Sequence, residues 1–395
     1  MKRLKHCKIY LAILLTIIAL FLSGCWDSRE LDKLSIVSGL GWDIEPDTGE
    51  VTLTYQSIIP GEIASSAGNG GGGGGQKGGE PLRTIQLDSD TGSSPYDVLS
   101  RYTQHGSRIP FYQHTQVYVF GWDGAEHGIY GFLDTQARNP VARPNVLMVV
   151  SEKKASDILG VQDGMESIQA VGMADIIKLS AAFSKYPAIT LLEFQNRIMS
   201  KTTAPIAPVI GIFEETGVEG EKIKKIRING TAVFKGDKMI GKLNERQSSG
   251  LLWAIDKVEK GYIDIPEASL EIVKAKSRMV PELRDGSIII TIEIDEESNL
   301  LEYKGHQDMN PDLISKMEKA QAEEIESQVK AAVQKSFSLN ADVFGFGEAV
   351  HRKYKKEWKA LEPKWDDIYP YLEVAVKVKT HVNEIGDVNK ALMKD

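Results

Sequence analysis

Two stretches near the end of the chain alternate in polarity so regularly that each predicts a strand with one buried face. Apolar residues take every second position over residues 288–294 and again over residues 372–378. Between them Asn310 and Pro311 provide a helix N-cap and a first-turn proline, and apolar residues recur at helical spacing to about Phe337. The pattern therefore predicts a mainly antiparallel sheet covered by a long amphipathic helix.

The first 25 residues have the pattern of an exported protein. Basic residues between Lys2 and Lys8 precede an apolar run from Ile9 to Leu22. A membrane-spanning helix needs about 20 apolar residues, and this shorter run ends in small residues, as a cleaved signal peptide does. The string Leu22-Ser23-Gly24-Cys25 resembles the lipobox of bacterial lipoproteins. Residues 1–24 are thus predicted to be removed; the alternative is an ordinary secretory signal with a chance cysteine.

Cys25 is the predicted lipid attachment site. The resemblance implies a diacylglycerol on its sulfur, with or without a further acyl chain on its amino group, and no other cofactor. Two or more acyl chains hold a protein lastingly on the outer face of the cytoplasmic membrane. The residues beside the lipid suit either the headgroup boundary or a membrane subunit, and both interpretations stay open for Trp26, Asp27, Arg29 and Glu30.

Cysteine content and charge exclude several classes of protein. Cys7 leaves with the signal and Cys25 is acylated, so no disulfide can form within the mature chain. The formal charge of −8 becomes −12 when the four cations of the signal are lost, which opposes nucleic-acid binding. No zinc-hydrolase, phosphate-loop or nucleophile-elbow motif is present. We therefore expect no enzyme, metal site or bound nucleotide.

Three distinct mixed α/β domains are predicted, which makes the fold class α+β. The first, 25–190, begins with a hairpin over residues 35–45 and 51–60, continues through a flexible glycine tract at 68–79, and then alternates strands with helices such as 95–105 and 125–138. The second, 191–278, is a small α+β unit whose hairpin turns at Gly236 and Asp237. The third, 279–395, holds the sheet and long helix described above.

Several strings, in order along nearly the whole chain, resemble one known family. They are Gly24-Cys25-Trp26-Asp27-Ser28-Arg29-Glu30-Leu31, then Val37, Gly39, Gly41, Asp43, Gln56 and Pro60, then Gly230-Thr231-Ala232-Val233-Phe234-Lys235 and Gly241-Lys242-Leu243-Asn244, and finally Ala341-Asp342-Val343-Phe344-Gly345-Phe346-Gly347 and Trp358. The chain resembles the Ger(x)C spore germination lipoproteins, the C subunits of nutrient germinant receptors in endospore-forming bacteria. It departs from their pattern at the glycine tract and at Lys355-Lys356.

The resemblance implies a non-catalytic subunit, anchored on the spore inner membrane, that assembles with two integral membrane subunits, one of them related to amino-acid permeases. A lipid-anchored solute-binding protein that delivers a nutrient to a permease and a cell-wall hydrolase are the alternatives. Within the last motif, Gly345 and Gly347 predict a tight connection, Asp342 predicts a helix cap, and Trp358 and Trp365 predict core cover.

Overall fold

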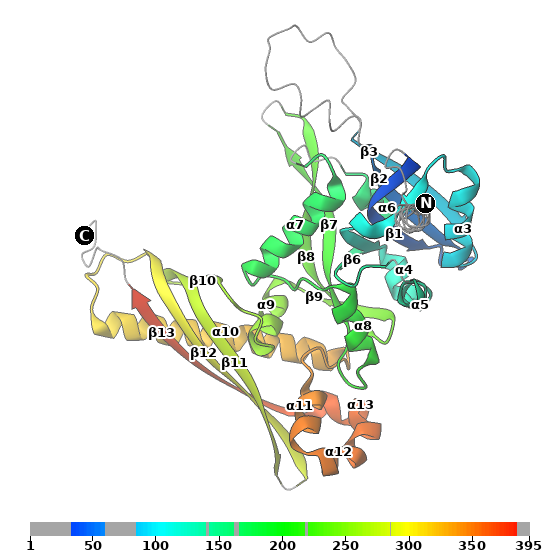
Figure 1. Ribbon diagram of the computed structural model, residues 1–395. Coiled ribbons are helices and arrows are strands. Elements are labelled where there is room, and N and C mark those ends of the chain that lie inside the picture. The colour runs from blue at the N-terminus through cyan, green and yellow to red at the C-terminus, as the bar shows by residue number, and fades with distance from the viewer. Residues whose placement is uncertain are drawn as a thin grey trace, which may run out of the picture.

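The computed structural model describes residues 33–59, 84–139, 142–161, 166–217, 220–284 and 286–384. Within these ranges the chain forms two β-sheets with helices packed on and between them (Figure 1). The predicted signal peptide, Cys25 and the glycine tract lie outside the described residues.

The first sheet combines a parallel centre with antiparallel flanks. Its strand order is β3-β2-β1-β5-β6-β7-β8-β9, and β4 pairs with the start of β1. Strands β1, β5, β6 and β7 pair in parallel, whereas the flanking strands pair antiparallel. The strands are β1 Leu34–Ile44, β2 Val51–Ile58, β3 Ile85–Gly92, β4 Ile109–Phe111, β5 Val117–Phe120, β6 Leu147–Ser151, β7 Ile206–Thr216, β8 Lys222–Lys235 and β9 Lys238–Leu243.

Helices cover both faces of this sheet, because its central strands are apolar on both sides. In β5, Tyr118 packs in the core that contains Phe132 of α5, whereas Val117 packs in a second core with Met173 of α7. A strand buried on both faces is typical of parallel sheets. The helices of this part are α3 Pro95–His105, α4 Trp122–His127, α5 Tyr130–Arg138, α6 Ala155–Leu159, α7 Gln169–Ala182, α8 Leu191–Met199 and α9 Glu245–Ala254.

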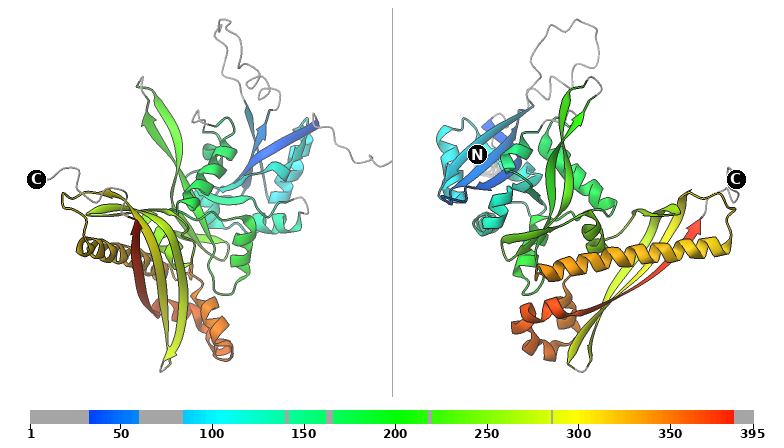
Figure 2. Two further views of the ribbon diagram at one scale, coloured as in Figure 1. Left: turned by 60° about the vertical axis from the view of Figure 1, so that its left-hand side comes forward. Right: turned by 180° about the vertical axis from the view of Figure 1, so that it is seen from behind.

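The second sheet has the order β10-β11-β12-β13 and lies against one long helix. Its strands are β10 Gly261–Ile265, β11 Ala268–Arg284, β12 Ser287–Tyr303 and β13 Glu373–Glu384, and the helix is α10 Pro311–Ser338. Figure 2 shows α10 running along the sheet. The side chain of Asn310 accepts a hydrogen bond from the Leu313 amide at 2.9 Å, as expected of the N-cap. Alternate β12 residues, such as Ile290 and Ile292, face the core.

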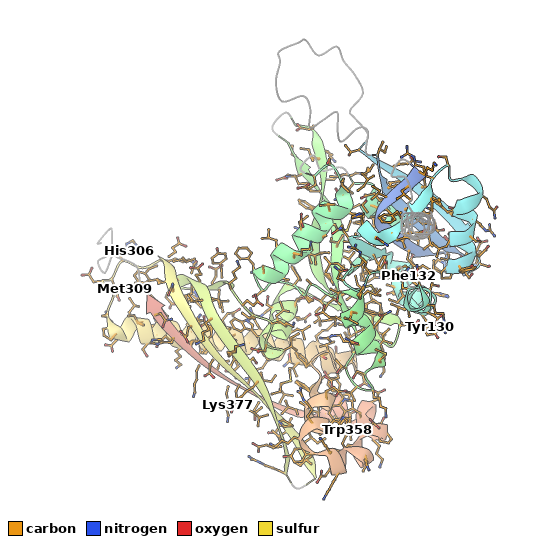
Figure 3. All side chains as sticks on the ribbon, in the orientation of Figure 1. Tyr130, Phe132, His306, Met309, Trp358 and Lys377 are labelled. Atoms are coloured by element: carbon orange, nitrogen blue, oxygen red, sulfur yellow. The ribbon has the colours of Figure 1, made fainter. Side chains whose placement is uncertain are left out.

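Short helices connect α10 to the last strand. These are α11 Phe346–Lys353, α12 Lys355–Leu361 and α13 Trp365–Ile368. Trp358 and Trp365 are buried among them with ring centroids 5.2 Å apart, and Figure 3 labels Trp358 in this cluster. The prediction that these two tryptophans cover a core is confirmed.

The predicted hairpins, the helices at 95–105 and 311–338, and the α+β class are confirmed. The helix predicted over residues 125–138 is two helices, because Gly128 between them has a φ of +131°. The predicted division near residue 190 falls between β6 and β7, which pair within one sheet, and the division at 278 falls inside β11. Strand pairing across those positions depends on contacts between distant residues, which local periodicity does not report.

Candidate functional site at the junction of the two sheets

The residues predicted to carry the lipid or touch a partner precede the described part of the chain. Cys25, Trp26, Asp27, Arg29 and Glu30 all lie outside the described residues. Within the described ranges, no helix is both long enough and apolar enough to span a membrane. The site that the structure does define lies elsewhere, where helices of the first sheet meet the second.

Asp342 fixes the start of α11 from a buried position. Its carboxylate accepts hydrogen bonds from the amides of Gly345 at 2.8 Å, Phe346 at 3.0 Å and Gly347 at 2.8 Å. The side chain is only 3 % exposed, and burial raises its pKa to about 6 although these bonds favour the charged form. Gly345 has a φ of +79°, which favours glycine. The predicted cap is confirmed.

Arg197 on α8 ties the first sheet to this cap. Its Nη1 donates to the carbonyl oxygens of Ala204 at 3.0 Å and Val343 at 3.1 Å. The Ala204 amide also donates to the Asp342 carbonyl oxygen at 2.8 Å. Burial lowers the pKa of Arg197, opposed by the charges of Asp342 and Glu193. Its guanidinium therefore bridges segments that are 146 residues apart.

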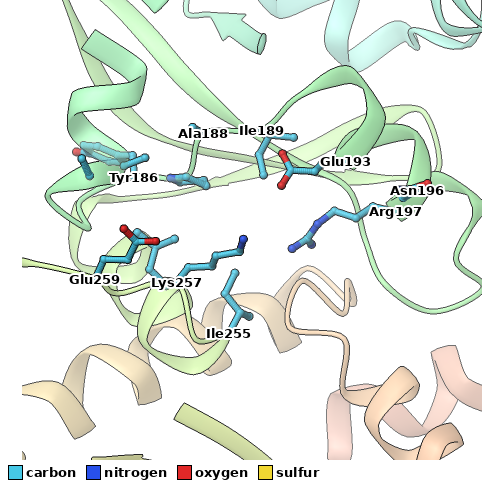
Figure 4. A pocket seen from close by; sticks show the side chains of 13 residues that line it. Tyr186, Ala188, Ile189, Glu193, Asn196, Arg197, Ile255, Lys257 and Glu259 are labelled. Atoms are coloured by element: carbon cyan, nitrogen blue, oxygen red, sulfur yellow. The ribbon is translucent and has the colours of Figure 1, made fainter. Parts of the chain in front are cut away.

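A pocket of about 360 Å³ opens beside Arg197. It lies between the end of α7, α8 and the segment after α9. Figure 4 shows the Arg197 and Lys257 side chains pointing toward one another across it, with Glu259 at the other end near Tyr186. An apolar wall completes the pocket and consists of Ala188, Ile189, Leu252 and Ile255.

The helices α7 and α9, which adjoin this pocket, each end in a residue with left-handed backbone conformation. Ser184, after α7, has a φ of +56°, and Asp256, after α9, has a φ of +58°. The Ser184 hydroxyl donates to the Lys260 carbonyl oxygen at 2.7 Å, and the Asp256 carboxylate accepts from the Ser277 amide at 2.7 Å. The Lys257 amide donates to the Leu252 carbonyl oxygen at 3.0 Å, which closes the end of α9. The backbone that carries Lys257 is thus fixed on both sides.

The second sheet contains a buried carboxyl group. Glu296 on β12 is 2 % exposed, and neither carboxylate oxygen has a hydrogen-bond partner among the described residues. Burial raises the pKa of Glu296 to about 8, although the polar side chains of Gln321 and Ser298 nearby favour the charged form. It lies on the same face of β12 as Ile294 and Ser298. Sequence alternation marks this position as buried but gives no sign of its charge state.

No group of three His, Cys, Asp or Glu residues in the described ranges could hold a metal ion. The charged groups at the pocket are the cations Arg197 and Lys257 and the carboxylates Glu193 and Glu259, beside an apolar wall. Sequence analysis missed both cations. Each looks like an ordinary surface cation in the sequence, and only the fold brings them together.

Two models of known protein families together match nearly the whole chain. Residues 27–212 match a family described as "Spore germination protein N-terminal domain", and residues 229–386 match one described as "Spore germination B3/ GerAC like, C-terminal". The chain belongs to the Ger(x)C family.

Individual proteins of known name also match most of the chain. Spore germination protein KC of Bacillus subtilis (strain 168) is 28 % identical over 96 % of this chain and 96 % of its own length. Spore germination protein GerQC of Bacillus cereus is 22 % identical over 95 % of this chain and 98 % of its own. The crystal structure of the GerBC protein matches 90 % of this chain and 99 % of its own, with a TM-score of 0.52 and 15 % identity, which shows a shared fold.

Ger(x)C signature residues in the described part of the chain maintain the fold. Gln56 accepts hydrogen bonds from the Ser38 hydroxyl and the Ala170 amide, both at 2.9 Å, and donates to the Leu159 carbonyl oxygen at 2.7 Å. The Asp43 carboxylate accepts from the Ala155 amide at 2.8 Å. These signature side chains link β1 and β2 to α6 and α7, so their contacts are structural.

Proposed function

We propose that this chain is a non-catalytic, lipid-anchored subunit of a spore nutrient germinant receptor that assembles with integral membrane subunits to trigger germination. The observation that carries the proposal is the similarity, over almost its whole length, to proteins named as spore germination proteins. The signal pattern that ends at Cys25 supports anchoring on the outer face of the cytoplasmic membrane, which in a spore is the inner membrane. The proposal includes two membrane subunits, one permease-like.

The architecture favours this proposal over a solute-binding protein that delivers a nutrient to a permease. Such proteins usually close two similar lobes around a hinge. Here a nine-stranded mixed sheet, covered by helices on both faces, is joined to a four-stranded sheet packed on a single long helix. The two units differ in strand number, order and cover, so they are not a pair of lobes of that kind.

Co-purification tests the receptor proposal. A tagged full chain, produced together with the permease-like subunit in spores, should retain that subunit in detergent extracts. Arg29→Glu and Glu30→Lys reverse charges beside the anchor and should weaken both retention and the fall in optical density after nutrient addition.

The matched control is Lys319→Glu, because Lys319 lies on the exposed side of α10 with 79 % of its side chain accessible. All variants should melt like the unchanged chain. Failure of the unchanged chain to retain the membrane subunit would refute the proposal, as would normal germination in spores that lack the chain.

A further inference from the structure

The pocket between α7, α8 and the segment after α9 presents two cations without an ionic partner. Among the described residues, neither Arg197 nor Lys257 forms an ion pair. We propose that this pocket binds a small organic carboxylate with a compact apolar body. The inference goes beyond the proposed receptor role, because neither lipid anchoring nor subunit assembly enters it.

Arg197 has N–H groups that are available to donate hydrogen bonds to such a ligand. Its Nη1 is engaged by two carbonyl oxygens, while Nε and Nη2 have no hydrogen-bond partner among the described residues. Carbonyl oxygens do not neutralise a cation, and a largely buried charge is costly until an opposite charge compensates it. The planar guanidinium matches a carboxylate in two-point geometry. The charges of Asp342 and Glu193 act on Arg197, but neither carboxylate hydrogen-bonds to it. An incoming carboxylate could bind the remaining guanidinium donors directly.

Glu193 lies at the same end of the pocket as Arg197 (Figure 4), but among the described residues no carboxylate forms an ion pair with Arg197 or Lys257. Glu193 Oε2 accepts from the Thr190 amide at 2.9 Å and the Thr190 hydroxyl at 3.0 Å, as part of the α8 capping box. The Asp342 carboxylate already accepts hydrogen bonds from three amides at the start of α11. Glu259 lies toward Tyr186, at the end of the pocket away from Arg197 (Figure 4). Lys257 then adds a second cation where the ligand carboxylate would lie.

The pocket also determines the size and polarity of the rest of the ligand. Ile189, Leu252 and Ile255 provide an aliphatic wall next to the two cations. Its volume of about 360 Å³ is near the lower end of the range for small-molecule sites, ~300–1,000 Å³. A compact branched acid fits this combination, whereas a folded partner or a long peptide does not.

The ends of two helices hold the backbone around the pocket in place. Three non-glycine residues in the described ranges have positive φ, and two of them, Ser184 and Asp256, adjoin this pocket. Each follows the last residue of a helix by two positions, α7 for Ser184 and α9 for Asp256, where a left-handed residue commonly ends a helix. They position Lys257 and the loop that faces it before any ligand arrives, which reduces the ordering cost of binding.

Methyl NMR of the full chain can test the proposal at the pocket itself. The chain is labelled at isoleucine methyl groups and titrated with 3-methylbutanoate, and in parallel with the neutral, similarly shaped 3-methylbutanamide. The Ile189 and Ile255 signals should shift with the acid, and the amide should need at least about tenfold more ligand, as expected when charge-assisted hydrogen bonds are lost.

Two lysine variants separate binding from folding. Lys257→Met keeps the aliphatic stem and should weaken binding of the acid about tenfold or more, with an unchanged melting temperature. Lys319→Met, on the exposed side of α10, should bind the acid as the unchanged chain does. The proposal fails if the acid leaves both methyl signals in place, if the amide binds equally well, or if Lys257→Met binds unchanged. Co-purification with a membrane subunit is unaffected by any of these outcomes.

Discussion

Gly250 allows α9 and α10 to pack together, and replacing it with alanine should destabilise the protein. A Cβ at this position would lie 2.0 Å from the Gln328 carbonyl oxygen and 2.4 Å from its carbon. Ordinary carbon–oxygen contacts are no closer than about 3.3 Å. Both obstructing atoms belong to the backbone of α10, so no side chain can rotate away. The two helices must therefore move apart by about 1 Å or more.

The magnitude follows from two opposing effects. Overpacking of a closely packed contact costs about 1–3 kcal/mol, and a backbone obstruction belongs near the upper end. Alanine in place of glycine inside a helix gains up to about 1 kcal/mol. The net loss is thus about 2 kcal/mol, or roughly 4–8 °C in melting temperature for a domain of this size. Separation would also strain the bidentate Arg246–Glu324 pair, now 2.6 and 2.9 Å.

Thermal unfolding followed by circular dichroism measures the effect, with Gly131→Ala as the control. Gly131 lies in α5, and a Cβ added there would be 3.5 Å from the nearest atom, Cγ of Pro95, which is ordinary contact. That variant should melt at the same temperature or slightly higher. If Gly250→Ala also melts unchanged or higher, helix propensity outweighs the contact and the described packing of α9 on α10 is wrong.

Two further predictions concern a buried carboxyl group and the anchor. The folded chain keeps Glu296 protonated up to about pH 8, whereas in the unfolded chain the proton is released near 4.5, so stability should fall as the pH rises between these values. Glu296→Gln should flatten that part of the urea-unfolding profile and gain most stability near pH 8; parallel profiles would contradict this origin. Cys25→Ala should leave the chain unprocessed or released from membranes, and a processed variant that still enters the detergent phase in Triton X-114 partitioning would contradict lipid attachment at Cys25.

Local signals in the sequence predicted individual elements well. Asn310 and Pro311 determine where α10 begins, and the Gly236-Asp237 turn separates β8 from β9 as expected. The capping role of Asp342 was also predictable, because its partners follow within five residues. In each case the determining contacts lie within a few residues along the chain.

The pairing of strands that are distant in the sequence could not be predicted from local patterns. Nothing in the periodicity of β6 and β7 indicates that Val150 lies opposite Val209, which continues the first sheet past residue 190. The pocket has the same origin, since Arg197 and Lys257 are 60 positions apart and meet only after α8 and α9 have packed. A cation at either position, considered alone, is indistinguishable from a solvated one.

The parallel pairing of β13 with β12 makes the second unit depend on a strand that is distant from β12 in the sequence. β12 is 17 residues long, and β13 follows only after α10 and the short helices. A chain synthesised only as far as Ser338 leaves unpaired the edge of β12 that β13 otherwise covers, from Ile289 to Asn299. Unpaired edges of this kind recruit other chains. Premature stop codons after α10 should therefore yield aggregates or protease substrates rather than a shortened working protein.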